Sequence, residues 1–289
     1  MRTSKKFTEE MTTLHSMLNV VETYQEIAAM RMRRVKKSVL NSREFLVDLN
    51  NTFKAVTFAY EEYLKRVSKY KETGRLLNKN GKEVLIFVSA NMGLYGDIIR
   101  KTFKAFKDEV TKGSTTADIV LIGKVGLDMY KVSGMTKPYT YYDLSDSGVD
   151  PANLKKILAT VLEYSQINVF HGLFKSVLAQ VPFKTTVTGD AANLENKYEA
   201  EGNVMFLFEP SVESIADYFE REVLSSVFEQ AIFESNLSKF SSRMVSLYSA
   251  TDNIRNSLKR VDFSMKKFNH KLFNSKQISR LSSVYLWSS

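Results

Sequence analysis

The chain has 289 residues, of which 44% are hydrophobic, and carries a formal net charge of +9 at pH 7. That length allows one large or two small domains, and the hydrophobic content is ordinary for a folded protein. The absence of cysteine excludes disulfides, thiolate metal sites and a cysteine nucleophile, and fits a cytoplasmic protein. Three widely separated histidines disfavour a zinc site built by the protein alone. No apolar run is long enough to span a bilayer.

The N-terminal stretch predicts one long amphipathic helix over residues 1–73. Its core positions recur at spacings of three and four residues, and 14 of the 16 are apolar or aromatic. They are Leu14, Leu18, Val21, Gln25, Ala28, Met32, Val35, Val39, Ser42, Leu46, Leu49, Phe53, Val56, Tyr60, Tyr63 and Val67. Neither glycine nor proline lies between Thr3 and Thr73, so nothing obvious breaks the helix. A run of about 55 residues would extend roughly 80 Å, longer than a globular domain is wide.

The C-terminal segment 211–289 repeats this pattern and contains no glycine or proline. Its core positions are Met244, Leu247, Thr251, Ile254, Leu258, Val261, Met265, Phe268 and Leu272. Two such helices can bury their apolar stripes only against each other or against a partner. We expect them to pair as an antiparallel coiled coil.

Between the two helices, residues 74–210 alternate expected strands with expected helices. The strand patterns lie at 84–89, 118–122, 138–144, 167–176, 183–188 and 204–208. Helical patterns lie at 98–110, from 123 to about 130, and after Pro151, and residues 189–203 read as a loop. Strand–helix–strand alternation predicts a small, mostly parallel, Rossmann-like α/β domain.

Basic residues are concentrated in two segments. Residues 31–37 hold five Lys or Arg and no acid, and residues 251–289 hold eight against two Asp. Residues 211–250, by contrast, hold six acids against three cations. The basic segments indicate an acidic partner, such as nucleic acid, anionic lipid or an acidic protein surface. A solvated helix face is the plain alternative.

No catalytic constellation is evident. Gly93 and Gly96 occupy a strand-to-helix turn, where a phosphate-binding loop would lie, but the remaining residues of such a motif are missing. We therefore expect glycine here because the turn needs a positive φ or close packing. His171 could act as a general base, yet no serine, carboxylate or second histidine accompanies it, so a structural or exposed role is favoured. Glu209 precedes Pro210 near the start of the last helix, where ordinary helix electrostatics explain an acid.

Several short motifs, in order along nearly the whole chain, are similar to one family. They are Ala28–Arg33, Gly93–Gly96, Gln180–Pro182, Phe208–Pro210, Glu234-Ser235, Ser242–Val245, Ser249–Asn253 and Phe268-Asn269. Each is weak alone, and the ordered set is specific. The chain resembles the γ subunit of rotary F-type ATP synthases.

The resemblance implies a central-stalk rotor with no catalytic, cofactor or metal site, because ATP, ADP and Mg are bound by partner subunits. It implies that one copy of the chain lies inside a hexamer of α and β subunits. The other implied partners are an ε-type subunit and a membrane c-ring or other motor proteins, and no nucleic acid is expected. The implied location is cytoplasmic, peripheral to the inner face of a bacterial cell membrane. The implied shaft contacts to the catalytic subunits are Arg31, Met32, Arg33, Arg34, Lys36, Arg243, Asp252, Asn253, Arg255 and Asn269. The implied foot contacts to ε and the ring are Gly93, Tyr95, Gly96 and Glu209.

The C-terminal end departs from the family. Leu272-Phe273, Lys276–Ser279 and Ser283–Trp287 replace its usual residues there, which favours a diverged member. One alternative is the shaft of a specialised ATP-hydrolysing motor without a proton ring. Others are a coiled-coil scaffold or nucleic-acid adaptor, and an α/β enzyme with a pocket near Gly93 and Gly96.

Overall fold

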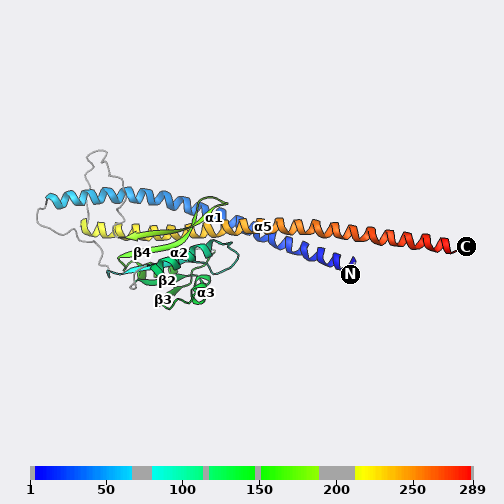
Figure 1. Cartoon of the computed structure of the whole chain (residues 1–289). Helices are drawn as coiled ribbons and strands as arrows, with labels where there is room; N and C mark the ends of the chain where they lie inside the picture. Colours follow the sequence, from blue (N-terminus) through cyan, green and yellow to red (C-terminus); the bar gives the residue numbers. More distant parts are fainter. Residues whose placement is uncertain (1–3, 67–79, 113–116, 147–150, 189–211, 288–289) are drawn as a thin grey trace. The chain divides into compact units, whose positions relative to one another are not determined.

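Two long helices flank the rest of the secondary structure. The computed structural model describes residues 4–66, 80–112, 117–146, 151–188 and 212–287 (Figure 1). Helix α1 spans Ser4–Arg66 and helix α5 spans Val212–Trp287, and both are continuous. The two terminal helices that the sequence predicts are therefore confirmed over these residues.

α1 and α5 run antiparallel, as predicted. By its internal contacts the chain divides into two compact units, which are Met1–Ala29 with Met244–Ser289, and Met30–Arg243. In the first unit, the ring centres of Phe7 and Phe268 lie 5.8 Å apart, and Arg255 donates a 2.9 Å hydrogen bond to Glu22. Residue numbers that rise on one helix therefore fall on the other.

The second unit shows the same pairing. Arg43 forms an ion pair with Glu234, and Leu49 shares a small apolar cluster with Val223. The antiparallel coiled coil is thus confirmed within each unit.

The predicted core positions lie inside the helix pair. Those of α1 from Leu14 to Leu49 are all buried or half-buried, and so are those of α5 from Met244 to Phe268. Leu272 is different, with 43% of its surface exposed, so its assignment to the core stripe is wrong. Phe268 already packs against Phe7, in the first described turn of α1, which leaves little helix to cover the next turn of α5.

The central segment forms one five-stranded sheet in the order β3-β2-β1-β4-β5. The strands are β1 Glu83–Val88, β2 Asp118–Ile122, β3 Tyr139–Tyr142, β4 Gln166–Phe174 and β5 Gln180–Thr188. β3, β2, β1 and β4 run parallel, and β5 pairs antiparallel with β4. The predicted mostly parallel sheet is therefore confirmed.

Helices cover both faces of this sheet, and we call the sheet with α2 (Ile98–Lys112), α3 (Lys124–Val132) and α4 (Pro151–Val161) the α/β domain. Val84, Ile86 and Val88 of β1 pack in a core with α4 and α5. Leu85 and Phe87 point the other way, into a core with α2 and α3. Because β1 is buried on both faces, its sequence is a continuous apolar run.

One strand differs from the prediction. β5 begins at Gln180 and contains Pro182, whereas the expected strand began after this proline. Proline is tolerated because β5 is an edge strand of the described sheet, where one side of the backbone needs no ladder partner.

Some expectations fall outside the described residues, namely the loop at 189–203, the strand at 204–208, and Glu209. Among the residues that are described, no helix is both long and apolar enough to cross a membrane.

Candidate functional site

The strand order changes direction at β1, whose neighbours are β2 and β4. In parallel sheets of this kind, the loops at the carboxyl ends of the strands beside such a reversal form the usual ligand crevice. The loop that follows β1, residues 89–97, lies there and carries Gly93 and Gly96. We therefore treat this loop as the first candidate site.

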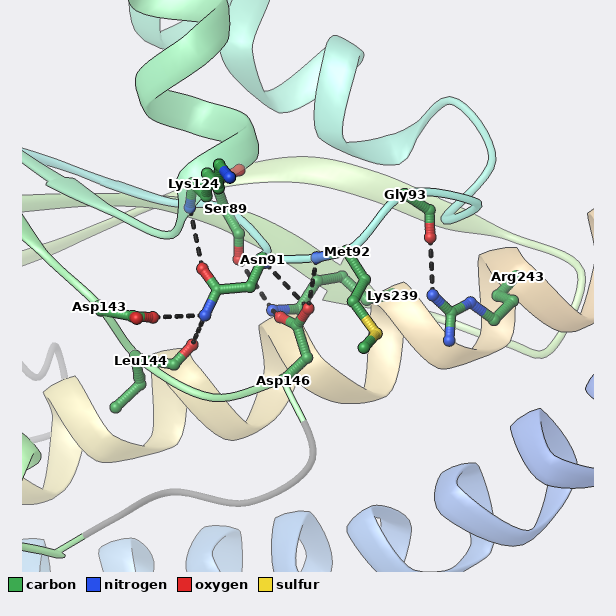
Figure 2. Close-up of polar contacts among 10 residues, drawn as sticks. All are labelled: Ser89, Asn91, Met92, Gly93, Lys124, Asp143, Leu144, Asp146, Lys239 and Arg243. Carbon is green, nitrogen blue, oxygen red and sulfur yellow. Dashed lines mark hydrogen bonds and ion pairs between the residues drawn. The ribbon is translucent and has the colours of Figure 1, made fainter.

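Arg243 of α5 occupies the glycine-containing turn (Figure 2). Its guanidinium donates hydrogen bonds to the carbonyl oxygens of Gly93 at 2.6 Å and Leu94 at 3.2 Å. Leu94 and Gly96 have positive φ values of 66° and 60°, which help this tight turn to form. A phosphate loop presents N–H groups to an anion, whereas this turn presents carbonyls to a cation. Its geometry does not suit a phosphate.

Lys239 lies one helical turn before Arg243 and binds the same loop from inside. Its buried Nζ donates to the carbonyl oxygen of Ser89 at 2.8 Å and to Oδ1 of Asp146 at 3.2 Å. The other oxygen of Asp146 accepts from the backbone N–H groups of Asn91 at 2.9 Å and Met92 at 3.0 Å. Burial lowers the pKa of the Lys239 amine, and the Asp146 charge opposes that shift.

Asn91 extends the network to the loop after β2 and adds contacts to the loop after β3. Its side-chain oxygen accepts from the backbone N–H of Lys124 at 2.9 Å, at the start of α3. Its amide nitrogen donates to the Asp143 carboxylate and to the carbonyl oxygen of Leu144 at 3.2 Å. Figure 2 shows these contacts converging on the loop after β1. At the carboxyl edge of the sheet, these polar groups are therefore bound to other groups of the same chain.

Tyr95, an expected foot contact, is buried, with 2% of its surface exposed. The Arg243 guanidinium carbon lies 4.0 Å from its ring centre, and the ring meets Phe240 edge-on. Burial raises the pKa of the Tyr95 phenol, and the Asp146 charge adds to this. Tyr95 thus packs against α5 from inside the turn, whereas Gly93, Leu94 and Gly96 of the same turn are exposed.

A hollow of about 340 Å³ lies beside this network. Its lining residues are Arg31, Asn91, Met92, Asp143, Ser145, Asp146 and Asn153. The carboxylate of Asp146 that faces it is already committed to Lys239 and two N–H groups. Neither Gly93 nor Gly96 lines this hollow.

The expected shaft contacts differ in their exposure to solvent. Those that are exposed are Arg33, Arg34, Lys36, Asp252, Asn253, Arg255 and Asn269. Arg31 and Met32 are half-buried, and Arg31 stacks 5.9 Å from the centre of the Phe240 ring. Arg243 is buried and bound to the loop after β1. The structure thus brings Arg243, Gly93 and Tyr95 together.

His171 lies inside β4, fully enclosed. Its Nε2 is 2.8 Å from Oγ1 of Thr185, and burial lowers its pKa to about 4. This favours a structural role. No group of three or more His, Asp or Glu side chains that could hold a metal occurs in the described part of the chain.

Comparison with known proteins identifies the family. An ATP synthase γ chain of Ruthia magnifica subsp. Calyptogena magnifica is 21% identical over 275 residues, covering 90% of both chains. That of Ruegeria pomeroyi is 25% identical over 263 residues, covering 86% of this chain and 87% of the relative. The sequence profile of the ATP synthase family matches residues 3–269. The chain belongs to the ATP synthase γ-subunit family.

Solved structures show the same fold. A chain from the central stalk and c-ring structure of the Tetrahymena thermophila mitochondrial ATP synthase is 18% identical, with a TM-score of 0.59, covering 80% of this chain and 99% of that one. A chain from the rotor of the Euglena gracilis mitochondrial ATP synthase is 15% identical, with a TM-score of 0.57, covering 93% of this chain and 98% of that one. The chain thus shares the fold of these central-stalk chains, and its family membership makes it a diverged γ subunit of an ATP synthase.

Proposed function

We propose that this γ subunit turns as a shaft within a hexamer of α and β subunits and performs no catalysis itself. The observation that supports this most directly is the binding of the loop after β1 by Lys239 and Arg243 of α5. Because side chains of α5 are hydrogen-bonded to a loop of the α/β domain, we expect this domain to move together with α5. ATP, ADP and Mg then belong to the partner subunits, which perform the chemistry.

The exposed cations of α1 are the proposed contact with the catalytic subunits. Arg33, Arg34 and Lys36 are solvent-exposed, so their charges can act on an acidic partner surface. Exposed charges interact weakly and at long range, which suits a shaft that must slide past successive partners. In the other unit, the exposed Asp252, Asn253, Arg255 and Asn269 of α5 are further proposed contacts.

The proposed foot contacts are the exposed Gly93 and Gly96, together with Glu209, which lies outside the described residues. Because the Tyr95 side chain is buried, we propose that it affects partner binding indirectly, by fixing the conformation of the turn. An ε-type subunit and a membrane ring are the proposed partners here. They would place the complex at the inner face of the cell membrane.

Affinity purification of the tagged native complex, followed by mass spectrometry, tests this function. Recovery of α and β subunits with ε and ring subunits supports a complete synthase rotor, coupled to proton movement. Recovery of the hexamer without ring subunits supports the specialised ATP-hydrolysing motor. Recovery of no ATPase subunit contradicts the rotor function.

The absence of cysteine allows a sharper test of the shaft contact. An Arg33→Cys variant would carry the only thiol of this subunit, which a bifunctional reagent should link to the catalytic subunit. Thr111→Cys, an exposed residue of α2, is the matched control and should give no such product. Equal products from both variants would contradict the proposed contact.

A further inference from the structure

Lys239 joins α5 to two separate parts of the α/β domain. Its Nζ binds the Ser89 carbonyl at the end of β1 and the Asp146 carboxylate in the loop after β3. The Lys239 and Asp146 side chains are 6% and 5% exposed. One side chain therefore holds α5 against the carboxyl edge of the sheet at two points.

The stability of the fold does not explain this pair. Taking two charges out of water is costly, and buried ion pairs can often be replaced by apolar residues without loss of stability. Apolar packing is non-directional, so a helix can shift or rotate slightly on a sheet at small cost. A hydrogen-bonded ion pair adds a directional restraint on that movement.

The position of the pair is also informative. Lys239 and Arg243 form the last turn of α5 that belongs to the unit containing the sheet, which ends at Arg243. Both cations bind backbone carbonyls of the loop after β1. A twisting force carried by α5 would enter the α/β domain at this turn.

We propose that the buried Lys239–Asp146 ion pair is the joint that makes α5 and the α/β domain rotate as one body. Lys239 acts as a positioning residue, since the groups that it binds belong to its own chain. The inference rests on the proposed rotor function.

The test uses the assembled complex of this chain with its hexamer subunits. A bead is attached through Lys131→Cys, an exposed residue of α3, and the width of its angular fluctuations is measured while the fixed hexamer is stalled. In the joint variant Lys239→Met/Asp146→Asn both charges are removed, and Asn keeps an oxygen for the N–H groups of Asn91 and Met92. Lys101→Met, which breaks the exposed Lys101–Asp97 pair, is the control.

In the joint variant the angular variance should rise at least twofold, with the ATP hydrolysis rate within twofold of wild type. The control should match wild type in both. If the angular variance of the bead is the same in the joint variant as in wild type, the proposed role of the ion pair is wrong, because packing alone would then hold α5. A wild-type complex that hydrolyses ATP without turning the bead would overturn the rotor function itself.

Hydrogen exchange in the free full chain provides a second readout if the joint variant does not assemble. The Asn91 and Met92 amides should exchange at least tenfold faster in that variant, while Ile86 and Phe87 in β1 keep their wild-type rates. Equal acceleration at all four amides would show a general loss of stability and overturn the joint.

Discussion

Arg43 of α1 donates two hydrogen bonds to a single carboxylate oxygen of Glu234 on α5, the bond from Nε being 2.7 Å long. Gln230 donates to the same oxygen at 3.0 Å. The Glu234 side chain is only 4% exposed, and its second oxygen is buried without a hydrogen-bond partner in the described structure. The buried carboxylate thus depends on Arg43.

Replacing Arg43 with methionine should lower the free energy of unfolding by about 2 kcal/mol, because it leaves a buried carboxylate without its cation. Urea denaturation of the purified chain measures this. Arg255→Met is the matched control, since its partner Glu22 is partly exposed and that pair should contribute less than about 1 kcal/mol. Equal losses of unfolding free energy in both variants would contradict the claim that the buried Glu234 carboxylate depends on Arg43.

His171 should make stability depend on pH. Its Nδ1 lies 3.2 Å from the Gly172 carbonyl, which can only accept, so Nδ1 carries the proton and Nε2 accepts from Thr185. Burial lowers the pKa from 6.5 to about 4, so between these values the unfolded chain binds a proton that the folded chain does not. The contribution of His171 to the free energy of unfolding is therefore fully present above pH 6.5, and it falls by up to about 3 kcal/mol as the pH drops toward 4.

His171→Gln isolates this effect, because Gln can accept from Thr185 but does not titrate. Melting temperatures of both chains are compared at pH 7, 6 and 5. Carboxylates titrate in both chains and largely cancel in the comparison. Wild type should lose more stability than the variant as pH falls, and parallel curves would refute the role of His171.

Gly172 allows β4 to approach α5. A Cβ built on Gly172 would lie 2.5 Å from Oγ of Ser238 and 3.0 Å from Ile98. Gly172→Ala should therefore destabilise the chain by about 1–3 kcal/mol through overpacking. Adding Ser238→Ala should recover part of the loss, which a double-mutant cycle would measure as coupling.

Gly93→Ala is the control for this cycle. Nothing lies within 4 Å of a Cβ at Gly93, so its stability should be close to wild type. A purely additive double mutant at Gly172 and Ser238 would argue against the proposed contact.

The sequence predicts the elements well because their patterns are local. The core stripes of α1 and α5 follow helical spacing, and β1 is a continuous apolar run buried on both faces. The errors occur where tertiary context decides. Leu272 has helical spacing but little of α1 opposite it, and Pro182 lies within a strand because that strand is at the sheet edge.

The site was harder to predict. Gly93, Tyr95 and Arg243 belong to motifs, and the structure brings them together. Lys239, Asp146 and Asn91 were missed, since they lie far apart in the sequence and match no motif that we considered. The one local signal is Lys239 itself, a lone cation within the mostly buried stretch from Ala231 to Ser242.

Neutralising the shaft cations should slow assembly with the hexamer. In Arg33→Gln/Arg34→Gln/Lys36→Gln, the association rate should fall about tenfold at low salt, with a smaller effect at high salt, because exposed charges steer association. Arg100→Gln/Lys104→Gln/Lys107→Gln, on the exposed face of α2, is the matched control. Stopped-flow binding at several salt concentrations measures both.

An equal effect of the two triple variants would point to net charge rather than a specific contact. Salt-dependent binding to DNA, lost only in the shaft variant, would favour the nucleic-acid adaptor instead.

Direct observation of rotation would show whether this subunit turns within the hexamer. The complex of this chain with its α and β subunits is fixed by the hexamer, and a bead is attached through Lys131→Cys. On addition of ATP, the bead should turn continuously in one direction. A complex that hydrolyses ATP while its bead only fluctuates about one angle would contradict the rotor.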